Sequence, residues 1–485
     1  MAHWRSVFQK LDEWRFLLPK TFKEGMLTEG LIYADEQMID HIVSDNAHVQ
    51  VANVACLPGI VGRSLAMPDI HLGYGFAIGG VAAFDPEAGG IISPGGVGYD
   101  INCGCRVLRT DLIYDEIKDK IESITNKLAS EVPSGVGSKG PISLNSKELD
   151  KVLVEGSKWA AKNGYGTQDD VDHTEANGAL EGADPSKVSS HAKERGADQL
   201  GTLGSGNHFL EVQRVEEIYD QKVADAFGLF KGQITIMVHS GSRGLGHQVC
   251  TDYIRVMQEA LQKYHITVPD RQLCCAPINS PEGLDYFGAM AAAANYAWCN
   301  RQLLMHWTRD SFSRVLGASP EKLGIKLIYD VAHNIAKKEK HKIDGKEKLL
   351  CIHRKGATRA FPAGNPEIPD DYKEVGQPVL IPGDMGRYSY VLVGTEQAMK
   401  ETWGSVCHGA GRLMSRAAAT RQMSVAGLLK ELEDAGVIVR AASKKGLVEE
   451  APEAYKDVRE VVNIVDQAGL ARKVAKMKPL GVVKG

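Results

Sequence analysis

The sequence lacks a hydrophobic run long enough to cross a membrane. Its apolar stretches all fall short of the roughly 18 residues that a span needs. The first residues, MAHWRSVFQKLDEW, carry charges where a signal peptide would have its apolar segment. These absences predict a cytoplasmic protein with no membrane partner.

A strong net charge is missing as well. The 57 Lys and Arg residues are nearly balanced by 61 Asp and Glu residues, which gives a formal net charge of −4. Such a chain has no overall basic field to attract nucleic acid. We therefore expect any polyanion to be held by a local basic patch.

The cysteines do not form the dense framework of a small secreted domain. There are nine, an odd number, and they are scattered along 485 residues. Cys103 and Cys105 are one residue too close for a CxxC pair, and no second pair follows. This pattern disfavours both a disulfide framework and a zinc finger.

What is present is an alternation of helix and strand signals. Residues 8–18 (FQKLDEWRFLL) and 34–43 (ADEQMIDHIV) carry helical signals. Residues 51–110 consist of short apolar runs broken by Gly and Pro, which is typical of strands and tight turns. Residues 115–132 have an apolar residue every three or four positions, which predicts an amphipathic helix ended by Pro133.

The rest of the chain continues this mixture. Residues 137–206 are polar and glycine-rich, with a helix expected over 147–162, and we interpret them as an exposed excursion. Helices are also expected over 288–307 and 412–434. Three apolar runs further along resemble strands: QITIMVHSGSR, KLIYDVAHN and PVLIPGDMGRYSYVLVG. Without an internal repeat or a linker, the sequence favours a mixed α/β (α+β) fold in a single compact domain, residues 1–485.

Histidines follow buried strands at three places. His239 ends one apolar run, His333 ends another, and His208 lies in GTLGSGNHFLE. A strand end fixes a side chain well, although a lone histidine in such a place is more often structural. With Asp100 and Cys103 they make up the ligand set of a transition-metal site, which Zn, Co or Mn would suit.

The segment SVCHGAGRLMSR, residues 405–416, predicts a phosphate site. Gly409 and Gly411 leave backbone N–H groups open, a helix is expected to begin just after them, and Arg412 and Arg416 would share one face of it. His408 would then face a phosphate as ligand, general base or nucleophile. The alternative is an ordinary helix start with solvated arginines.

Two further loops, residues 239–248 and 353–364, also place basic residues among glycines. The residues are Arg243, Arg354, Lys355 and Arg359. Single charges of this kind are usually solvated surface groups. Three similar loops could together line one polyanion groove.

Three other motifs are better explained by structure than by function. GVGSKG, residues 135–140, fits GxGxxG but follows a helix rather than a strand. KIDG, residues 342–345, resembles the nucleophile motif of lysine-dependent ligases, yet its polar flanks predict a hairpin turn at Asp-Gly. DDVDHTE, residues 169–175, is interpreted as solvated loop.

Long motifs along nearly the whole chain resemble the RtcB family of RNA-splicing ligases. They include MPDIHLGYGFAIGG, GGVGYDINCGCR, GTLGSGNHFLEV, HSGSRGLG, HRKGATRAFPAG and CHGAGR. The resemblance implies GTP-dependent joining of an RNA 3′-phosphate or 2′,3′-cyclic phosphate to a 5′-hydroxyl end. It also implies tRNA halves as candidate substrates and an archease protein as a candidate partner.

The same resemblance implies roles for particular residues. Cys103 would bridge two Mn²⁺ ions, with Asp100 and His208 on one and His239 and His333 on the other, and His408 would be guanylylated. Arg243, Arg412 and Arg416 would hold RNA phosphates. The implied guanylate-binding residues are Asn207, His208, Phe209, Glu211, Asn334, Pro382, Gly383, Asp384, Met385, Ser389, Gly409, Ala410, Gly411, Tyr455 and Lys484. Asp384 stands where many members have Ser, which adds a negative charge near the implied nucleotide.

Two rival functions remain open from the sequence. A metal-dependent cyclic phosphodiesterase or RNA phosphatase would use the same ligands without a covalent nucleotide. A scaffold with a structural metal would bind RNA ends without turnover. Dependence of product formation on GTP separates the ligase from the phosphodiesterase. Turnover and an easily exchanged metal separate it from the scaffold.

Overall fold

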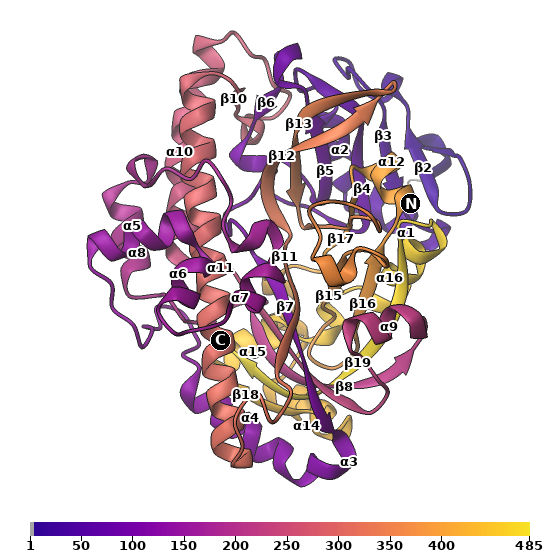
Figure 1. Ribbon diagram of the computed structural model, residues 1–485. Coiled ribbons are helices and arrows are strands. Elements are labelled where there is room, and N and C mark those ends of the chain that lie inside the picture. Colours follow the sequence, from indigo (N-terminus) through magenta and orange to yellow (C-terminus); the bar gives the residue numbers. More distant parts are fainter. Residues whose placement is uncertain (1–3) are drawn as a thin grey trace.

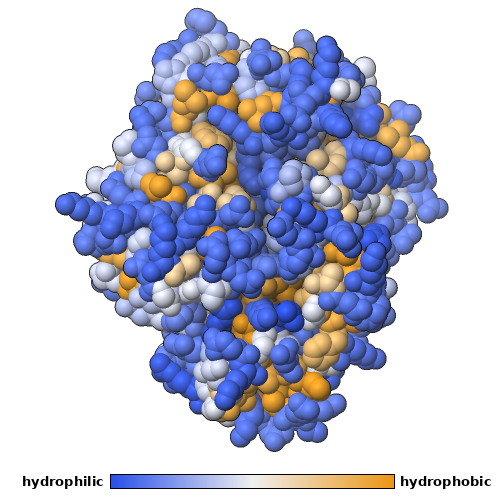
Figure 2. All heavy atoms as spheres, viewed as in Figure 1, coloured by the Kyte–Doolittle hydropathy of each residue, from blue (hydrophilic) through white to orange (hydrophobic). Residues whose placement is uncertain are grey.

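The structure, a computed structural model, describes residues 4–485 and has a mixed α/β architecture built around two large sheets (Figure 1). The chain's N-terminal part, in indigo, forms much of the first sheet, and two long helices run along the opposite side of the view. Hydrophilic residues dominate the face in Figure 2, and the hydrophobic ones form small separate groups. No helix among residues 4–485 has the length and apolar character that a membrane span needs.

The first sheet has seven strands. Their order is β1 (Gln9–Lys10), β2 (Arg15–Leu18), β3 (Gly30–Tyr33), β4 (Ile60–His71), β5 (Ile78–Phe84), β13 (Lys346–Lys355) and β12 (Asn334–Ile343). Apolar residues of its strands pack with those of three helices in one core cluster. These helices are α1 (Glu36–Ser44), α2 (Ala47–Val54) and α16 (Val458–Gln467).

The second sheet carries most of the predicted ligands. Its strands follow the order β11 (Lys326–Ala332), β7 (Gly104–Ile113), β9 (Gln233–Ser240), β8 (Phe209–Ile218), β19 (Ala471–Lys484), β16 (Ser389–Gly394) and β15 (Pro378–Ile381), with β18 (Ile438–Ala441) beside β19. Alternate residues face opposite clusters: Met237 packs in one, and Ile236 and Val238 in the other. Both faces of the second sheet are buried at β9, which explains why the sequence of this strand is a continuous apolar run.

Two long helices cover the molecule on one side. They are α10 (Arg243–Lys263) and α11 (Pro281–Leu316). Residues 137–206 hold α5 (Ser146–Glu155), α6 (Ser157–Lys162), α7 (Gln168–Asp172) and α8 (Ser190–Ala197). Many of their residues are exposed, but Leu149, Val152 and Leu153 join the core cluster of α10 and α11.

The remaining elements are short. The helices are α3 (Tyr114–Ile117), α4 (Ile121–Glu131), α9 (Gln221–Phe227), α12 (Glu396–Thr402), α13 (Arg416–Gln422), α14 (Val425–Asp434) and α15 (Lys444–Glu449). Two small sheets pair β6 (Ile91–Ile92) with β10 (Ala276–Pro277) and β14 (Ala357–Arg359) with β17 (Ser405–Cys407).

Several local expectations are confirmed. Residues 34–43 overlap α1, residues 288–307 lie within α11, and most of 412–434 lies in α13 and α14. KIDG is a hairpin between β12 and β13, and Asp344 and Gly345 both have positive φ, at 49° and 79°. Lys342 therefore lies at the end of strand β12, next to the turn.

Other expectations were wrong. Residues 8–18 form β1 and β2 rather than a helix, because β2 pairs with β3 and buries Phe16, Leu17 and Leu18. Residues 51–54 belong to helix α2 instead of a strand. DDVDHTE is not a solvated loop: Asp170 is buried in an ion pair with Arg309, and Glu175 is buried as well.

Candidate metal and nucleotide site

Antiparallel pairing brings the predicted ligands to one edge of the second sheet. Cys103 precedes β7 and His208 precedes β8, whereas His239 lies near the end of β9 and His333 follows β11. The register places His239 between Cys105 and Phe209, and Ala332 opposite Gly104. Strand starts and strand ends therefore meet at the same edge.

A cleft of about 740 Å³ opens at this edge. Such a volume is in the range of small-molecule sites. Its walls come from the strand ends of both sheets, from residues 408–416 and from the last strand. Predicted residues that line it are Asp100, Cys103, Asn207, Phe209, His239, His333, Asn334, Pro382, Gly383, Asp384, Met385, His408, Gly409, Ala410, Gly411, Arg412, Arg416, Tyr455 and Lys484.

Cys103 lies at the centre of what we call the ligand cluster: Asp100, Cys103, His208, His239 and His333. Its Sγ lies 3.3 Å from His208 Nε2 and 3.2 Å from His239 Nε2. His239 Nε2 is 3.3 Å from His333 Nε2, and His208 Nε2 is 2.8 Å from Asp100 Oδ2. Two groups of three potential ligands result, and Cys103 belongs to both.

Burial keeps the imidazoles of this cluster neutral. It lowers the pKa of His239 and of His333 well below the ordinary value, so each ring offers a lone pair. His208 Nδ1 lies 3.1 Å from the Leu203 carbonyl oxygen, and its Nε2 lies beside Cys103 and Asp100. Burial and the Asp100 carboxylate raise the pKa of Cys103, and a bound metal ion would reverse this by holding the thiolate.

One guanidinium holds three of the ligand-bearing segments. Arg301, on α11, donates to the carbonyls of Asn102 and Ser240 at 2.7 and 2.9 Å and forms a two-pronged pair with Asp330 at 2.8 Å. Asn102 precedes Cys103, Ser240 follows His239, and Asp330 is three residues before His333. Arg106 pairs with the same aspartate at 2.7 Å, and all three charged side chains are fully buried.

His408 lies beside this cluster and is oriented by Asp69. The His408 Nδ1 donates to Asp69 Oδ2 at 2.5 Å, and the backbone N–H of His408 donates to the same oxygen at 2.9 Å. The His408 ring centroid is 5.0 Å from that of His333. Although burial alone would raise the pKa of Asp69, its contacts with His408 lower it below the ordinary value.

The backbone around Asp69 and His408 requires a glycine. Gly411 has φ +73°, and a Cβ there would lie 2.2 Å from the Asp69 carbonyl oxygen. Lys456 donates to the carbonyls of Pro68 and Ile70, both at 2.8 Å, so the two neighbours of Asp69 are fixed as well. Sequence reasoning named neither Asp69 nor Lys456, although Asp69 lies within the quoted motif MPDIHLGYGFAIGG.

The aromatic residues of the predicted nucleotide site each lie beside a basic group. Arg412 lies over the Tyr455 ring at 4.9 Å, and Lys484 lies over the Phe209 ring at 5.7 Å. Lys484 ends strand β19 and is 4% exposed. The last-but-one residue of the chain is thus a buried strand residue and not a mobile tail.

The carboxyl groups predicted near the nucleotide are both buried. Burial raises the pKa of Glu211 to about 7. Asp384 Oδ1 accepts from the backbone N–H groups of Gly386 and Arg387, both at 3.0 Å, so this oxygen stabilises its own loop. Burial also raises the pKa of Asp384.

Two other predicted residues use their side chains to hold the backbone. The Asn334 amide donates to the Asp100 carbonyl at 3.1 Å and accepts from Gly356 N–H at 2.8 Å. Ser389 is buried, and its hydroxyl accepts from Gly383 N–H at 3.2 Å.

The predicted phosphate-binding arginines already have partners. Arg412 and Arg416 pair with the buried Glu450 at 3.1 and 2.9 Å. Arg412 lies before the helix, since α13 begins at Arg416, so the two do not share a helix face as expected. Arg243 Nη1 lies 3.1 Å from His208 Nδ1, beside the ligand cluster.

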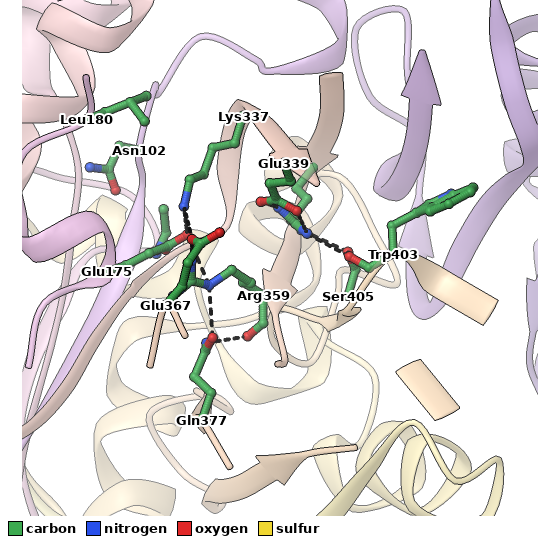
Figure 3. Close-up of polar contacts among 12 residues, drawn as sticks. Asn102, Glu175, Leu180, Lys337, Glu339, Arg359, Glu367, Gln377, Trp403 and Ser405 are labelled. Atoms are coloured by element: carbon green, nitrogen blue, oxygen red, sulfur yellow. Dashed lines mark hydrogen bonds and ion pairs between the residues drawn. The ribbon is translucent and has the colours of Figure 1, made fainter. Parts of the chain in front are cut away.

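The expectation that Arg354 and Arg359 line a polyanion groove was wrong. Both are fully buried, and Figure 3 shows Arg359 among its polar partners. Arg354 pairs with Glu339 at 2.6 Å and donates to the Ser405 hydroxyl, and Arg359 pairs with Glu367 at 2.7 Å. Burial of an unpaired charge would be costly, and here every charge is matched.

Comparisons with known proteins agree with this arrangement. The family model described as tRNA-splicing ligase RtcB matches residues 50–485. The chain belongs to the RtcB family. It is 55% identical over 480 residues to the tRNA-splicing ligase RtcB of Archaeoglobus fulgidus, covering 99% of each chain. This chain is 56% identical over 477 residues to the protein of the same name from Thermococcus kodakarensis, with 98% of each chain covered. It is 48% identical over 478 residues to that of Nanoarchaeum equitans, with 98% of this chain and 99% of the relative covered. The Asp, Cys and His groups gathered at the strand ends are compatible with metal binding in a member of this family.

Proposed function

We propose that this protein is a GTP- and Mn²⁺-dependent RNA ligase that joins an RNA 3′-phosphate or 2′,3′-cyclic phosphate to a 5′-hydroxyl end. One observation carries the proposal. His408, oriented by the buried Asp69, lies with its ring 5.0 Å from that of the candidate ligand His333 in a cleft large enough for a nucleotide. The names of the relatives support tRNA halves as the substrate.

The ligand cluster fits two metal ions that share Cys103. Asp100 and His208 would hold one ion, and His239 and His333 the other. The mixture of sulfur, nitrogen and oxygen ligands admits Mn²⁺ without selecting it. When bound, the ions would act as Lewis acids that offset charge on phosphoryl oxygens.

His408 is suited to act as a nucleophile. Because Nδ1 donates to Asp69, Nε2 is the ring nitrogen left to act as the nucleophile. Nε2 attacks the α-phosphorus of GTP, the bond to the β-phosphate oxygen breaks, and pyrophosphate leaves. The Asp69 carboxylate stabilises the positive charge that develops on the ring.

The guanine base has candidate partners among the predicted nucleotide-binding residues. Phe209 and Tyr455 offer faces for stacking. An ionised Glu211 could accept both N–H donors on one edge of guanine. Asp384 uses only Oδ1 to accept from the N–H groups of Gly386 and Arg387. Its Oδ2 has no hydrogen-bond partner among residues 4–485 and remains a candidate acceptor for the base.

The guanylate then activates the RNA. Water would first open a 2′,3′-cyclic phosphate by attack on phosphorus, with the 2′-oxygen leaving and taking up a proton. An oxygen of the RNA 3′-phosphate then attacks the guanylate phosphorus, and the N–P bond electrons return to His408 Nε2. The 5′-hydroxyl attacks the activated 3′-phosphate, loses its proton and expels GMP. Arg243, Arg412 and Arg416 would hold RNA phosphates during these steps, with Arg412 and Arg416 leaving Glu450.

Labelling with α-labelled GTP and Mn²⁺ tests the proposal. We expect label that survives denaturation, is released by acid but not by alkali, and is absent from His408→Ala. Lys342→Ala is the matched control and should be labelled normally, because Lys342 lies at a hairpin end. Absence of label from all variants, with archease added, would favour a cyclic phosphodiesterase or a scaffold.

A further inference from the structure

Three aromatic rings pack together beside the ligand cluster. The Tyr99 and His247 rings are stacked, with centroids 4.9 Å apart and planes inclined by 29°. Tyr74 meets Tyr99 edge to face, with centroids 5.6 Å apart. Tyr74 lies in the loop between β4 and β5, Tyr99 in the loop before β7, and His247 on α10. We call these three residues the aromatic platform.

The aromatic platform is open to the cleft and to solvent. Tyr74 and Tyr99 line the cleft, and His247 is exposed. Tyr99 directly precedes the candidate ligand Asp100. Neither tyrosine hydroxyl has a hydrogen-bond partner among residues 4–485, so both are free to contact a ligand.

The loops that carry the two tyrosines are held in place by buried groups. The Lys355 ammonium donates to the carbonyls of Tyr74, Phe76 and Gly95, at 2.5, 3.1 and 3.1 Å. Gln272 accepts from Gly75 N–H at 2.9 Å. Rings on fixed loops lose little freedom when a ligand stacks on them, which favours binding.

Positive charge lies close to the platform. Arg243 is one helical turn before His247 on α10. Arg195, which is exposed on α8, donates to Gln248, the neighbour of His247. Aromatic faces with basic groups alongside are the combination by which proteins bind single-stranded nucleic acid.

We propose that the aromatic platform stacks an unpaired nucleobase of the RNA substrate, next to the end that is joined. The inference rests on the proposed function and adds a base contact outside the guanylate site. No ring contact joins the platform to Phe209 or Tyr455 within the described part of the chain. Because every base has a π face, this contact is tolerant of sequence.

Fluorescence of 2-aminopurine tests the stacking directly. The probe is a single-stranded RNA with a 3′-phosphate and 2-aminopurine as its last or next-to-last base, mixed with the full chain and Mn²⁺ but no GTP. We expect quenching on binding, and a dissociation constant roughly 5- to 150-fold higher for Tyr74→Leu and for His247→Leu. Tyr99→Phe keeps the ring and should keep the quenching.

A control and two outcomes make the test decisive. Tyr219→Leu removes a tyrosine that is 42% exposed at the end of β8 and should bind RNA like the wild type. Unchanged affinity and quenching in both Tyr74→Leu and His247→Leu would overturn the inference. Failure of the proposed function would instead appear as unlabelled wild-type protein with GTP, so the two failures are distinguishable.

Discussion

The ligand cluster and the arginine segment, which comprises Arg412, Arg416 and Glu450, hold their polar groups in different ways. The four Cys and His residues of the cluster are at most 4% exposed, and Arg301 holds the segments that carry three of them. In the arginine segment, the Arg416 side chain is 53% exposed, and both arginines share one carboxylate. The first arrangement fixes geometry, as metal ions require, and the second leaves cations that can exchange one anionic partner for another.

The largest expected effect comes from the shared thiol. Cys103→Ala removes a ligand from both candidate metal sites, so we expect guanylylation and joining to fall by more than about a thousandfold, on the scale of losing a metal or a catalytic group. Arg412→Ala should keep guanylylation and lose mainly RNA affinity. Equal loss of guanylylation in both variants would contradict this division between the two regions.

A smaller effect on metal binding is expected from Arg301, which holds the segments of the ligand cluster. Arg301→Met frees the segments that carry Cys103, His239 and His333, and we expect Mn²⁺ affinity to fall about 10- to 100-fold, as for other groups that orient metal ligands. Calorimetric titration with Mn²⁺ measures this.

The matched control is Arg309→Met on the same helix, which breaks the buried pair with Asp170. Both variants should lose stability, by about 3–5 kcal/mol. Only Arg301→Met should lose metal affinity, and equal metal affinity in the two variants would show that Arg301 merely stabilises the fold.

The pH dependence of GTP binding tests Glu211. Because burial raises the pKa of Glu211 to about 7, the carboxylate that would accept from guanine is lost as the pH falls through 7. We expect GTP affinity to fall by up to about tenfold for each pH unit below 7. Glu211→Gln should bind more weakly with no such dependence between pH 6 and 8, and an unchanged profile would exclude Glu211 as the group responsible.

The smallest effects are expected in the arginine segment. Arg412→Ala should weaken RNA binding and reduce its salt dependence by about one released counterion. Glu450→Gln should act in the opposite direction, because it removes the charge that Arg412 and Arg416 now neutralise. Filter binding at several salt concentrations measures both, and weaker binding in Glu450→Gln would mean that the carboxylate positions the arginines rather than competing for them.

Sequence patterns identified the candidate metal ligands that lie at the starts and ends of strands. Cys103, His208, His239 and His333 each flank an apolar run or a glycine-rich turn, and antiparallel pairing brings them to one edge. The resemblance was needed for Lys484 and Tyr455, because no local pattern shows that β19 buries the end of the chain.

Other features depend on contacts between distant segments. Asp69 is about 340 residues from His408, and Arg301 about 200 from Asn102, so neither role could be predicted locally. Arg354 and Arg359 looked like phosphate ligands because no local pattern marks Glu339 and Glu367, 15 and 8 residues away, as their partners. Residues 8–18 were misassigned because a short apolar run has no period that separates strand from helix.

The central claim is that one thiolate serves two metal ions beside His408. Electron paramagnetic resonance of the protein titrated with Mn²⁺ tests it most directly. We expect two ions per chain, a spectrum that shows magnetic coupling between them, and loss of that coupling in Cys103→Ala. A single uncoupled ion, or a coupled pair that persists without Cys103, would contradict the account.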